Sequence, residues 1–333
     1  MSARVSILMP VYNGGKAFRL TLRNIFAQSY KDYEIIINDD GSTDNTAEIA
    51  HSFGDPRIKY DRTEHVGYSK NLECCRRRAS GEILFLMGAD DFLARGVLQR
   101  TIDAFSLPDV GAVTRAYFWF DQDIRMPVRA LTQLNPDKDE IIRVTDSYER
   151  IAAVFHTVGQ LSGLAMRTEY VNMPFHDDIF TSHIYPFASI LKRHAVVYLH
   201  GYTLAVQIRT SQCRKMSVIY DKSPLQSWVE MYQTVFYEPE FRQLRDRLVS
   251  EHAATNYLGL VQIRNYSRFR NVLREIGLLI KHRPRNIFNP AFWFFALGTV
   301  TMPPCLLVPL VDWYKHHIHS KRCPSIQFDY DIA

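Results

Sequence analysis

Cysteine is scarce in this 333-residue chain, and its spacing fits neither a disulfide framework nor a zinc site. The five cysteines are Cys74, Cys75, Cys213, Cys305 and Cys323. Their number is odd, the only close pair is adjacent in sequence, and no Cys-x-x-Cys spacing occurs. We therefore expect a reducing compartment, the cytoplasm, for this chain.

Other missing signals exclude further classes of protein. The N-terminus opens directly into a strand-like apolar run, without the basic and apolar regions of a secretory signal peptide, so none is expected. No motif typical of RNA- or DNA-reading proteins occurs, so nucleic acid is not an expected partner. No Gly-rich, basic triphosphate loop follows the first predicted strand, which argues against a nucleotidyltransferase.

The composition is that of a large folded protein. Apolar residues make up 47% of the chain and charged residues 23%. The length suffices for one large domain or two ordinary ones. The formal net charge is only +5, but basic residues are concentrated between residues 264 and 285.

Strand-like and helix-like patterns alternate along the first part of the chain. Short apolar runs predict strands at residues 4–9, 35–37, 58–60 and 82–87, the first of them ended by Pro10. Helical spacing predicts helices at residues 16–28, 46–53, 68–78 and 97–105. This alternation predicts an α/β fold with a parallel, doubly wound sheet and right-handed crossovers.

Two pairs of aspartates directly follow two of these strands. Asp39 and Asp40 follow one strand, and Asp90 and Asp91 follow another. The carboxyl ends of parallel strands form the edge where open α/β sheets bind ligands. One pair can accept hydrogen bonds from a nucleobase or ribose, and the other can bind a divalent cation through hard oxygen ligands. Either pair alone is also compatible with a capped turn; the two together favour a site.

The order and spacing of these segments resemble those of a known family. Pro10 to Asn13, Asp39 to Asp44, and Gly81-Glu82 leading to Asp90-Asp91 resemble the nucleotide-binding half of a family 2 glycosyltransferase of the GT-A fold, over residues 1–115. The resemblance implies inverting transfer of a sugar from a nucleoside-diphosphate sugar, with a UDP-sugar favoured. It also implies Mg²⁺ or Mn²⁺ as cofactor.

The resemblance assigns a role to each matched residue. Pro10 and Tyr12 are expected to lie against the nucleobase, and Asp40 to accept a hydrogen bond from it. Asp90 is expected to reach the ribose or the donor sugar, and Asp91 to bind the cation that bridges the diphosphate. The residues expected to bind the donor are Pro10, Tyr12, Asn13, Asp39, Asp40, Lys70, Asp90 and Arg209.

Two basic residues are candidates for the diphosphate. Lys70 stands where the family usually has arginine; lysine can neutralise a phosphate but cannot bind it with two parallel hydrogen bonds. Arg209 follows a predicted strand at residues 196–206, and its guanidinium suits phosphate geometry. The competing interpretations are a solvated helix residue for Lys70 and a surface salt bridge for Arg209.

The general base is open between a carboxylate and a histidine. Residues 159–167 resemble the segment before the family's acceptor site, where an acidic pair follows and its second member is the base. Counting back from residues 188–199, which resemble the helix and strand after the base, leads to His183, whereas the acidic pair Asp177-Asp178 lies five residues earlier. Either group can take a proton. Asp178 is favoured for its acidic identity, with His183 and Asp177 as further catalytic candidates. The non-catalytic interpretations are a packed helix residue for His183 and an N-cap or solvated residue for Asp177.

The C-terminal region changes to amphipathic helical spacing. An uncharged run at residues 286–311 follows the basic segment, and prolines divide it into pieces too short to cross a bilayer singly. We expect a basic helix and a Trp/Phe-rich helix that lie in the interface of an anionic membrane. A soluble core or oligomer interface, or a spanning segment, are the alternatives. Similar tails occur in family members with lipid-linked acceptors.

Taken together, the sequence predicts three regions and one principal function. Residues 1–115 would bind the nucleotide sugar, 116–222 would bind the acceptor and catalyse transfer, and 223–333 would form the helical region, with its membrane-interface segment at about 264–322. The implied acceptor is a polyprenyl-diphosphate-linked glycan of polysaccharide biosynthesis, at the cytoplasmic face of the inner membrane. A catalytically inactive nucleotide-sugar-binding module is the alternative, and an oligomer is possible.

Overall fold

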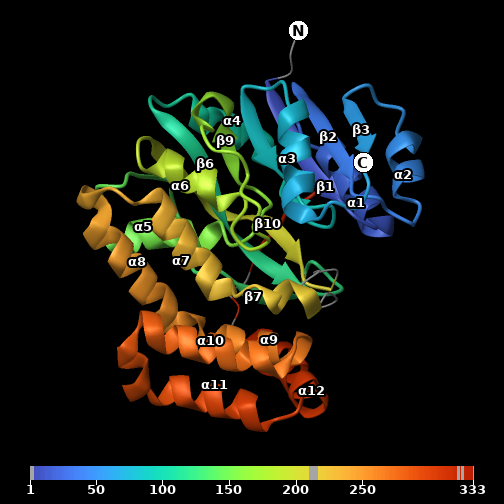
Figure 1. Cartoon of the computed structure of the whole chain (residues 1–333). Coiled ribbons are helices and arrows are strands. Elements are labelled where there is room, and N and C mark those ends of the chain that lie inside the picture. The colour runs from blue at the N-terminus through green and yellow to red at the C-terminus, as the bar shows by residue number, and fades with distance from the viewer. Residues whose placement is uncertain (1–3, 210–216, 321–322, 324–325, 333) are drawn as a thin grey trace. The chain divides into compact units, whose positions relative to one another are not determined.

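The structure is a computed structural model of the chain that describes residues 4–209, 217–320, 323 and 326–332 (Figure 1). It contains two compact units, Met1–Ile208 with Cys323–Ala333, and Arg209–Arg322. The predicted boundaries at residues 115 and 222 stay predictions. Four cysteines, Cys74, Cys75, Cys305 and Cys323, are free thiols, and Cys213 lies outside the described residues.

The first unit is built on a ten-stranded sheet with the order β3-β2-β1-β4-β9-β6-β10-β5, in which β7 also pairs with β6 and β8 with β10. Its strands are β1 (Val5–Val11), β2 (Tyr33–Asp39), β3 (Ile58–Arg62), β4 (Ile83–Leu86), β5 (Phe92–Leu93), β6 (Val110–Phe120), β7 (Pro127–Ala130), β8 (Glu140–Ile142), β9 (Ala165–Arg167) and β10 (Ala195–Gln207). Its helices are α1 (Gly15–Phe26), α2 (Thr46–Ser52), α3 (Tyr68–Arg78), α4 (Val97–Phe105), α5 (Tyr148–Thr157) and α6 (Ile184–Leu191).

The sheet is mixed, so the prediction of a parallel, doubly wound sheet is correct for only part of it. Strands β3, β2, β1 and β4 are parallel, as are β6 and β10. The short strand β9 lies between β4 and β6 and is antiparallel to both. β9 is only three residues long, and the sequence pattern did not predict it.

The first strand is longer than its sequence suggests. β1 continues through Pro10 to Val11, so the expectation that Pro10 ends it is wrong. The partner β4 pairs with β1 only as far as Leu8, while β2 pairs along its whole length. Beyond Leu8 one side of β1 is therefore an edge, where the missing N–H of proline is tolerated.

Helices cover both faces of this sheet. Alternate residues of β1, such as Ile7 and Met9, share a buried core with Phe18 and Leu22 of α1 and Leu98 of α4. Removing each of these large apolar side chains from water stabilises the fold by about 1.5–3 kcal/mol. Helix α3 contacts β1 and β2 and carries no residue of this core, so it covers the opposite face (Figure 1).

The second unit is helical, as predicted. Its helices are α7 (Pro224–Val235), α8 (Arg242–Thr255), α9 (Gly259–Tyr266), α10 (Phe269–His282), α11 (Pro290–Thr301) and α12 (Pro304–Tyr314). Short 3₁₀ helices cover Thr168–Tyr170 in the first unit and Ser217–Asp221, Pro239–Phe241, Asn256–Leu258 and Pro284–Phe288 in this one, which ends in a π-helix at Lys315–His319. The buried Glu275 ties α10 to the start of α7 by accepting the N–H of Leu225 at 2.9 Å.

The uncharged run forms two separate helices. α11 begins at Pro290 and ends before Pro303, and α12 begins at Pro304, so these prolines divide the run as expected. Pro309, which was also expected to divide it, lies inside α12. In the described part of the chain, no helix combines the length and apolar character that crossing a membrane requires.

Candidate active site

The two aspartate pairs lie at one edge of the sheet. β2 and β4 flank β1 and run parallel to it, so their carboxyl ends point the same way. Asp39 is the last residue of β2, and Asp90 and Asp91 stand between β4 and β5. Since neighbouring strands are ~4.8 Å apart, the two strand ends are separated by about 10 Å. Both pairs thus follow strands that end at this one edge of the sheet, and their roles there stay predictions.

Asp39 is a structural member of its pair. Its side chain is fully buried; Oδ1 accepts the N–H of Ser42 at 2.7 Å and Oδ2 accepts the hydroxyl of Tyr60 at 2.7 Å. Gly41 follows at φ 76°, a conformation that glycine adopts without strain. Asp39 therefore shapes the turn after β2 and is not exposed to a ligand.

Asp40 anchors the loop that leads into α3. Its Oδ1 accepts the N–H of Val66 at 2.7 Å, and its Oδ2 accepts the N–H of Gly67 at 3.0 Å. The Nδ1 of His65 lies 2.9 Å from Oδ2, and the Asp40 side chain is nearly inaccessible to solvent. Asp40 thus holds His65 in place, and a nucleobase would have to share its oxygens with these donors.

The exposed surface beside Asp40 is aromatic. The ring of Tyr12 is 36% exposed, and its centroid lies 4.6 Å from that of His65. Pro10 is partly buried two residues earlier. Planar rings at this point can stack on a nucleobase, because every base presents a π-face. Sequence reasoning missed His65, although its place just before the Gly67–Asn71 segment was a usable signal.

Asn13 connects the two loops of this edge. Its backbone N–H donates to the Oγ of Ser42 at 2.8 Å, and its Oδ1 accepts the N–H of Thr43 at 2.8 Å. Asn13 has a φ of 52°, in the left-handed region that asparagine tolerates better than most residues. Its role in the structure is to join the loop after β1 to the loop after β2.

Asp91 is buried and accepts three hydrogen bonds. Its side chain is 1% exposed; Oδ1 accepts the N–H of Gln207 at 3.0 Å, and Oδ2 accepts the Nε2 of Gln160 at 2.8 Å and the hydroxyl of Ser162. Burial, reinforced by the charge of Asp90, raises the pKa of Asp91 to about 8. Sequence reasoning placed residues 159–167 near the acceptor, whereas Gln160 and Ser162 bind Asp91.

Asp177, a candidate general base, and Lys70, a candidate ligand of the diphosphate, lie next to each other at the surface. The Nζ of Lys70 lies 3.9 Å from the Oδ2 of Asp177, and their side chains are 63% and 71% exposed. An exposed pair of this kind contributes less than about 1 kcal/mol. Both groups can therefore exchange this contact for a ligand at little cost.

Asp178 is turned into the protein. Its Oδ1 accepts the N–H of Phe180 at 2.8 Å and that of Thr181 at 3.1 Å, and its side chain is buried. These bonds close the turn that precedes α6. To accept a proton from an acceptor hydroxyl, Asp178 would have to leave this turn.

His183 is a packed histidine in this structure. It precedes α6 and is buried; Nε2 lies 2.9 Å from the carbonyl oxygen of Val158, which can only accept, so Nε2 carries the proton. The hydroxyl of Tyr68 lies 3.4 Å from Nδ1 and is therefore the donor there. Burial lowers the pKa of His183 to about 4, so the ring is neutral at pH 7.

Arg209 is exposed and begins the second unit. Its predicted contact with the diphosphate stays a prediction. The residues that follow it, 210–216, lie outside the described part of the chain.

Comparison with known proteins agrees with this geometry. Residues 6–160 match the family model described as "Glycosyl transferase family 2". A stretch of 127 residues is 31% identical to the glycosyltransferase GlyG of Streptococcus pneumoniae, covering 37% of this chain and 42% of GlyG. Residues 6–160 thus form a glycosyltransferase family 2 domain. A longer stretch of 181 residues is 28% identical to an uncharacterized glycosyltransferase of Nostoc sp., covering 53% and 54% of the two chains.

Solved glycosyltransferases share the fold. The crystal structure of S. aureus TarS 1-349 in complex with UDP-GlcNAc aligns with a TM-score of 0.63 at 15% identity, over 99% of each chain. The mannosyltransferase PcManGT from Pyrobaculum calidifontis, solved with GDP-Man and Mn²⁺, aligns with a TM-score of 0.54 at 17% identity, over 96% of this chain and 86% of that one. The fold is therefore GT-A, followed by a helical C-terminal region. The chain spans about two-fifths of the length of GlyG.

The residues of this glycosyltransferase fit a divalent cation at the second aspartate pair. A buried carboxylate beside a second carboxylate is destabilised by like charge, and a hard cation relieves that repulsion. Among the described residues, no three His, Cys, Asp or Glu side chains gather into a metal cage, so further ligands would come from a diphosphate and water. Asp90 is partly exposed, whereas Asp91 is only 1% exposed. Asp90 is therefore better placed than Asp91 to contact the cation directly.

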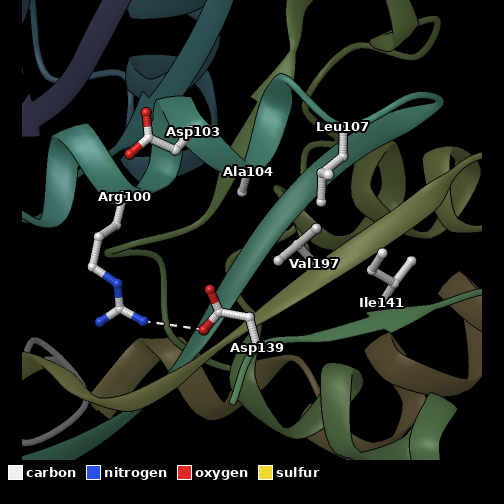
Figure 2. A pocket seen from close by; sticks show the side chains of 7 residues that line it. All are labelled: Arg100, Asp103, Ala104, Leu107, Asp139, Ile141 and Val197. Atoms are coloured by element: carbon white, nitrogen blue, oxygen red, sulfur yellow. Dashed lines mark hydrogen bonds and ion pairs between the residues drawn. The ribbon is translucent and has the colours of Figure 1, made fainter.

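One open pocket of the glycosyltransferase lies away from these residues. It measures about 340 Å³ and is lined by Arg100, Asp103, Ala104, Leu107, Asp139, Ile141 and Val197 (Figure 2). The ion pair of Arg100 with Asp139, at 3.1 Å, occupies its polar side. None of the predicted site residues lines it, and its two paired charges leave no clear preference for a ligand.

Proposed function

We propose that this glycosyltransferase moves a sugar, with inversion, from a nucleoside-diphosphate sugar to a hydroxyl of a glycan acceptor. The observation that carries the proposal is the edge of the sheet at which the exposed Tyr12 ring, Asp40 and the Asp90–Asp91 pair come together. UDP is the favoured nucleotide, because TarS was solved with UDP-GlcNAc and with UDP. Mn²⁺ or Mg²⁺ is the favoured cofactor, because PcManGT was solved with Mn²⁺.

Each residue of the edge has a defined task in this proposal. The nucleobase stacks on Tyr12, and the loop anchored by Asp40 lies beside the edge of the base. Asp90 holds the cation, and Asp91 fixes the turn on which Asp90 stands. The cation, when bound, neutralises the charge that develops on the leaving diphosphate. Lys70 adds a point charge to the same diphosphate.

Accessibility favours Asp177 as the general base. A base must come within hydrogen-bond reach of the acceptor hydroxyl, directly or through one water. Asp177 is exposed, whereas Asp178 is held in a turn and His183 is buried with a pKa near 4. Asp178 remains the second candidate, because catalytic contacts often form only when substrate binds.

The base assignment is testable with three variants. Removing a general base lowers kcat by about 10²–10⁴-fold. We expect this loss for Asp177→Asn, and a much smaller one for Asp178→Asn and for His183→Gln, with donor binding measured in parallel. A loss confined to Asp178→Asn would return the role to that residue. Full activity of all three would place the general base at another residue.

The helical unit supports a membrane acceptor. Large apolar side chains are exposed around α11 and α12; Phe288 is 82%, Phe294 74% and Leu306 63% exposed. Exposed apolar patches of this kind mark interaction sites. The same unit carries exposed arginines at positions 268 and 270. We propose that this surface lies on anionic lipid at the cytoplasmic face of the inner membrane and that the acceptor is a polyprenyl-diphosphate-linked glycan.

Two experiments test the proposed function. A ligand that binds only the folded state raises the melting temperature, so a panel of UDP, GDP and CDP with and without Mn²⁺ should show a shift with one of them. Donor hydrolysis without acceptor then reports turnover. A melting shift with no hydrolysis and no transfer to any lipid-linked acceptor would identify a binding module. The absence of a shift with every nucleotide would contradict the proposed donor class.

For the membrane contact, a variant with Phe288, Phe294 and Leu306 changed to serine is the informative one. This variant should no longer sediment with vesicles in which about one third of the lipid is anionic, while it keeps its donor binding. Exposed apolar side chains contribute to interfacial binding in proportion to their buried area. Unchanged sedimentation would place the membrane contact elsewhere or remove it.

A further inference from the structure

The end of the chain returns to the first unit. Residues 326–331, here called the C-terminal strap, belong to the unit that contains the sheet, although the helical unit precedes them in sequence. Ile326, Phe328 and Tyr330 pack against a cluster that includes Phe92 and Phe118. Gln327 and Asp329, which alternate with them, are exposed. The strap thus buries one side along the sheet, as a strand does, without joining the ladder.

The apolar side of the strap touches the residue after Asp91. The ring centroid of Tyr330 lies 5.9 Å from that of Phe92, and the centroid of Phe328 lies 5.2 Å from that of Phe118 on β6. Phe92 is buried. Aromatic pairs at these distances add about 0.5–1.5 kcal/mol each beyond their burial. Phe92, and through it the turn that bears Asp91, is therefore held from the strap side.

The polar groups of the strap bind the same stretch of backbone. The N–H of Arg95 donates to the carbonyl oxygen of Asp329 at 2.8 Å. The guanidinium of Arg95 contacts Asp329 at 3.0 Å and Asp331 at 2.8 Å. These ion pairs are exposed and weak by themselves, but they act at one end of a segment whose rings are already packed.

Helix α1 completes the support. Asn24 accepts the N–H of Leu93 at 2.8 Å and donates to the carbonyl oxygens of Leu93 at 3.0 Å and Asp331 at 2.9 Å. Thr21 donates to the carbonyl oxygen of Asp91 at 3.1 Å. Asn24 therefore binds β5 and the strap with one side chain, and the backbone from Asp91 to Arg95 is held from both sides.

We propose that the C-terminal strap is a positioning element that fixes the Asp90–Asp91 turn through Phe92, Leu93 and Arg95. Its loss loosens this turn and weakens cation binding, while the edge formed by Tyr12 and Asp40 keeps its structure. The part of the inference that concerns the cation rests on the proposed function. The part that concerns the turn does not, and the two are measured separately.

The first measurement is amide hydrogen exchange in the full chain and in Phe328→Ala/Tyr330→Ala. Local opening is reported by exchange of the amides involved. We expect exchange at residues 92–95 to rise by about tenfold or more, with little change in β2 and α3. A chain ended after Ser325 should show the same pattern. No change at residues 92–95, or an equal rise throughout the first unit, would overturn the proposal.

Single variants of the polar contacts are a matched test. Arg95→Gln removes both ion pairs of the strap, and Arg95→Lys restores the charge. Arg143→Gln is the control, because Arg143 forms a comparable surface pair with Asp109 at 2.6 Å. We expect faster exchange at residues 92–95 in Arg95→Gln, recovery in Arg95→Lys and no local change in the control.

The second measurement is the Mn²⁺ concentration that half-saturates the melting shift in the presence of UDP. Small misplacements of a site are costly, so the double variant should need about three- to tenfold more Mn²⁺, with an unchanged shift from UDP alone. Equal half-saturation in the wild type and the variant would overturn the positioning role. If the wild type itself shows no shift, the proposed donor class fails, and hydrogen exchange still decides whether the strap fixes the turn.

Discussion

The two aspartate pairs occupy the same edge of one sheet but balance their charge differently. Asp40 is surrounded by donors, namely two backbone N–H groups and His65. Asp91 also accepts hydrogen bonds, but it is buried beside Asp90, and its pKa is raised to about 8. The first pair is thus complete in the protein alone, whereas burial and the charge of Asp90 oppose the ionisation of Asp91 in the second. A cation at the second pair would favour its ionised form. Substitutions in the second pair should therefore act mainly on metal-dependent turnover, and substitutions in the first pair mainly on stability.

The largest expected effect is on turnover at the second pair. Asp91→Asn keeps the size of the side chain but removes the charge, and with it the hold on Gln160, Ser162 and Gln207 weakens. Loss of one preorganised electrostatic contact costs about 10²–10³-fold in kcat. We expect a loss of this size in metal-dependent donor hydrolysis. Asp90→Asn should cost at least as much if Asp90 contacts the cation. Wild-type turnover in both variants would show that the cation, if any, binds elsewhere.

The same substitution should reduce the pH dependence of stability in the metal-free protein. The pKa of Asp91 is higher in the folded state than in the unfolded one, so its contribution to stability is present at low pH and is lost as pH rises toward 8. Asp91→Asn removes this loss. Denaturant unfolding at pH 5 and pH 8, with chelator present, should therefore show a smaller fall with pH in the variant than in the wild type. A steeper fall in the variant would contradict the raised pKa.

The first pair should respond through stability. Asp40→Asn replaces one acceptor oxygen by an NH₂ group that faces a backbone N–H, either of Val66 or of Gly67. A buried donor without an acceptor costs about 1–3 kcal/mol, so the free energy of unfolding should fall by that amount. Asp44→Asn, on the same loop, is a control for surface charge. If Asp40→Asn unfolds like the wild type, the loop anchored by Asp40 contributes little to stability.

The difference between the pairs also explains which features the sequence predicts. Asp39, Asp40 and Gly41 form a local turn, so adjacent residues define it, and the boundaries of α3 and α4 follow from helical spacing in the same way. The partners of Asp91 are Gln160, Ser162 and Gln207, which lie 69, 71 and 116 residues away in sequence. Only the folded sheet brings them to Asp91, and a single sequence contains no signal for such contacts.

The prediction of the general base failed to account for burial, which also depends on distant parts of the chain. Sequence order places His183 before α6, but the sequence does not tell whether that position faces solvent. In the structure His183 packs against Val158 and Tyr68, and Asp177 is the accessible group. The antiparallel strand β9 and the C-terminal strap were missed for a related reason, since each is short and defined by distant partners.

A smaller effect on stability is expected from the buried His183, and it has a pH dependence opposite to that of Asp91. The pKa of His183 is near 4 in the folded state and near 6.5 unfolded, so the unfolded chain binds the proton first as pH falls. Its contribution to stability is therefore intact above pH 6.5 and falls by about 1 kcal/mol at pH 5.5. His183→Gln should reduce this slope. Equal slopes in the wild type and His183→Gln would show that His183 is not buried as a neutral ring.

The smallest expected effect concerns Lys70, which lies outside both pairs and is exposed. Its contact with Asp177 is weak, so Lys70→Ala should leave the melting temperature unchanged. A point charge on a diphosphate at an exposed site is worth less than about 1 kcal/mol, which corresponds to a roughly two- to fivefold rise in the donor KM. Lys70→Arg should recover this loss or lower KM further, because guanidinium can form two parallel hydrogen bonds with a phosphate. If Lys70→Ala instead lowers kcat and leaves KM unchanged, Lys70 acts on Asp177 and thus on the acceptor side, and the diphosphate contact must come from another basic residue.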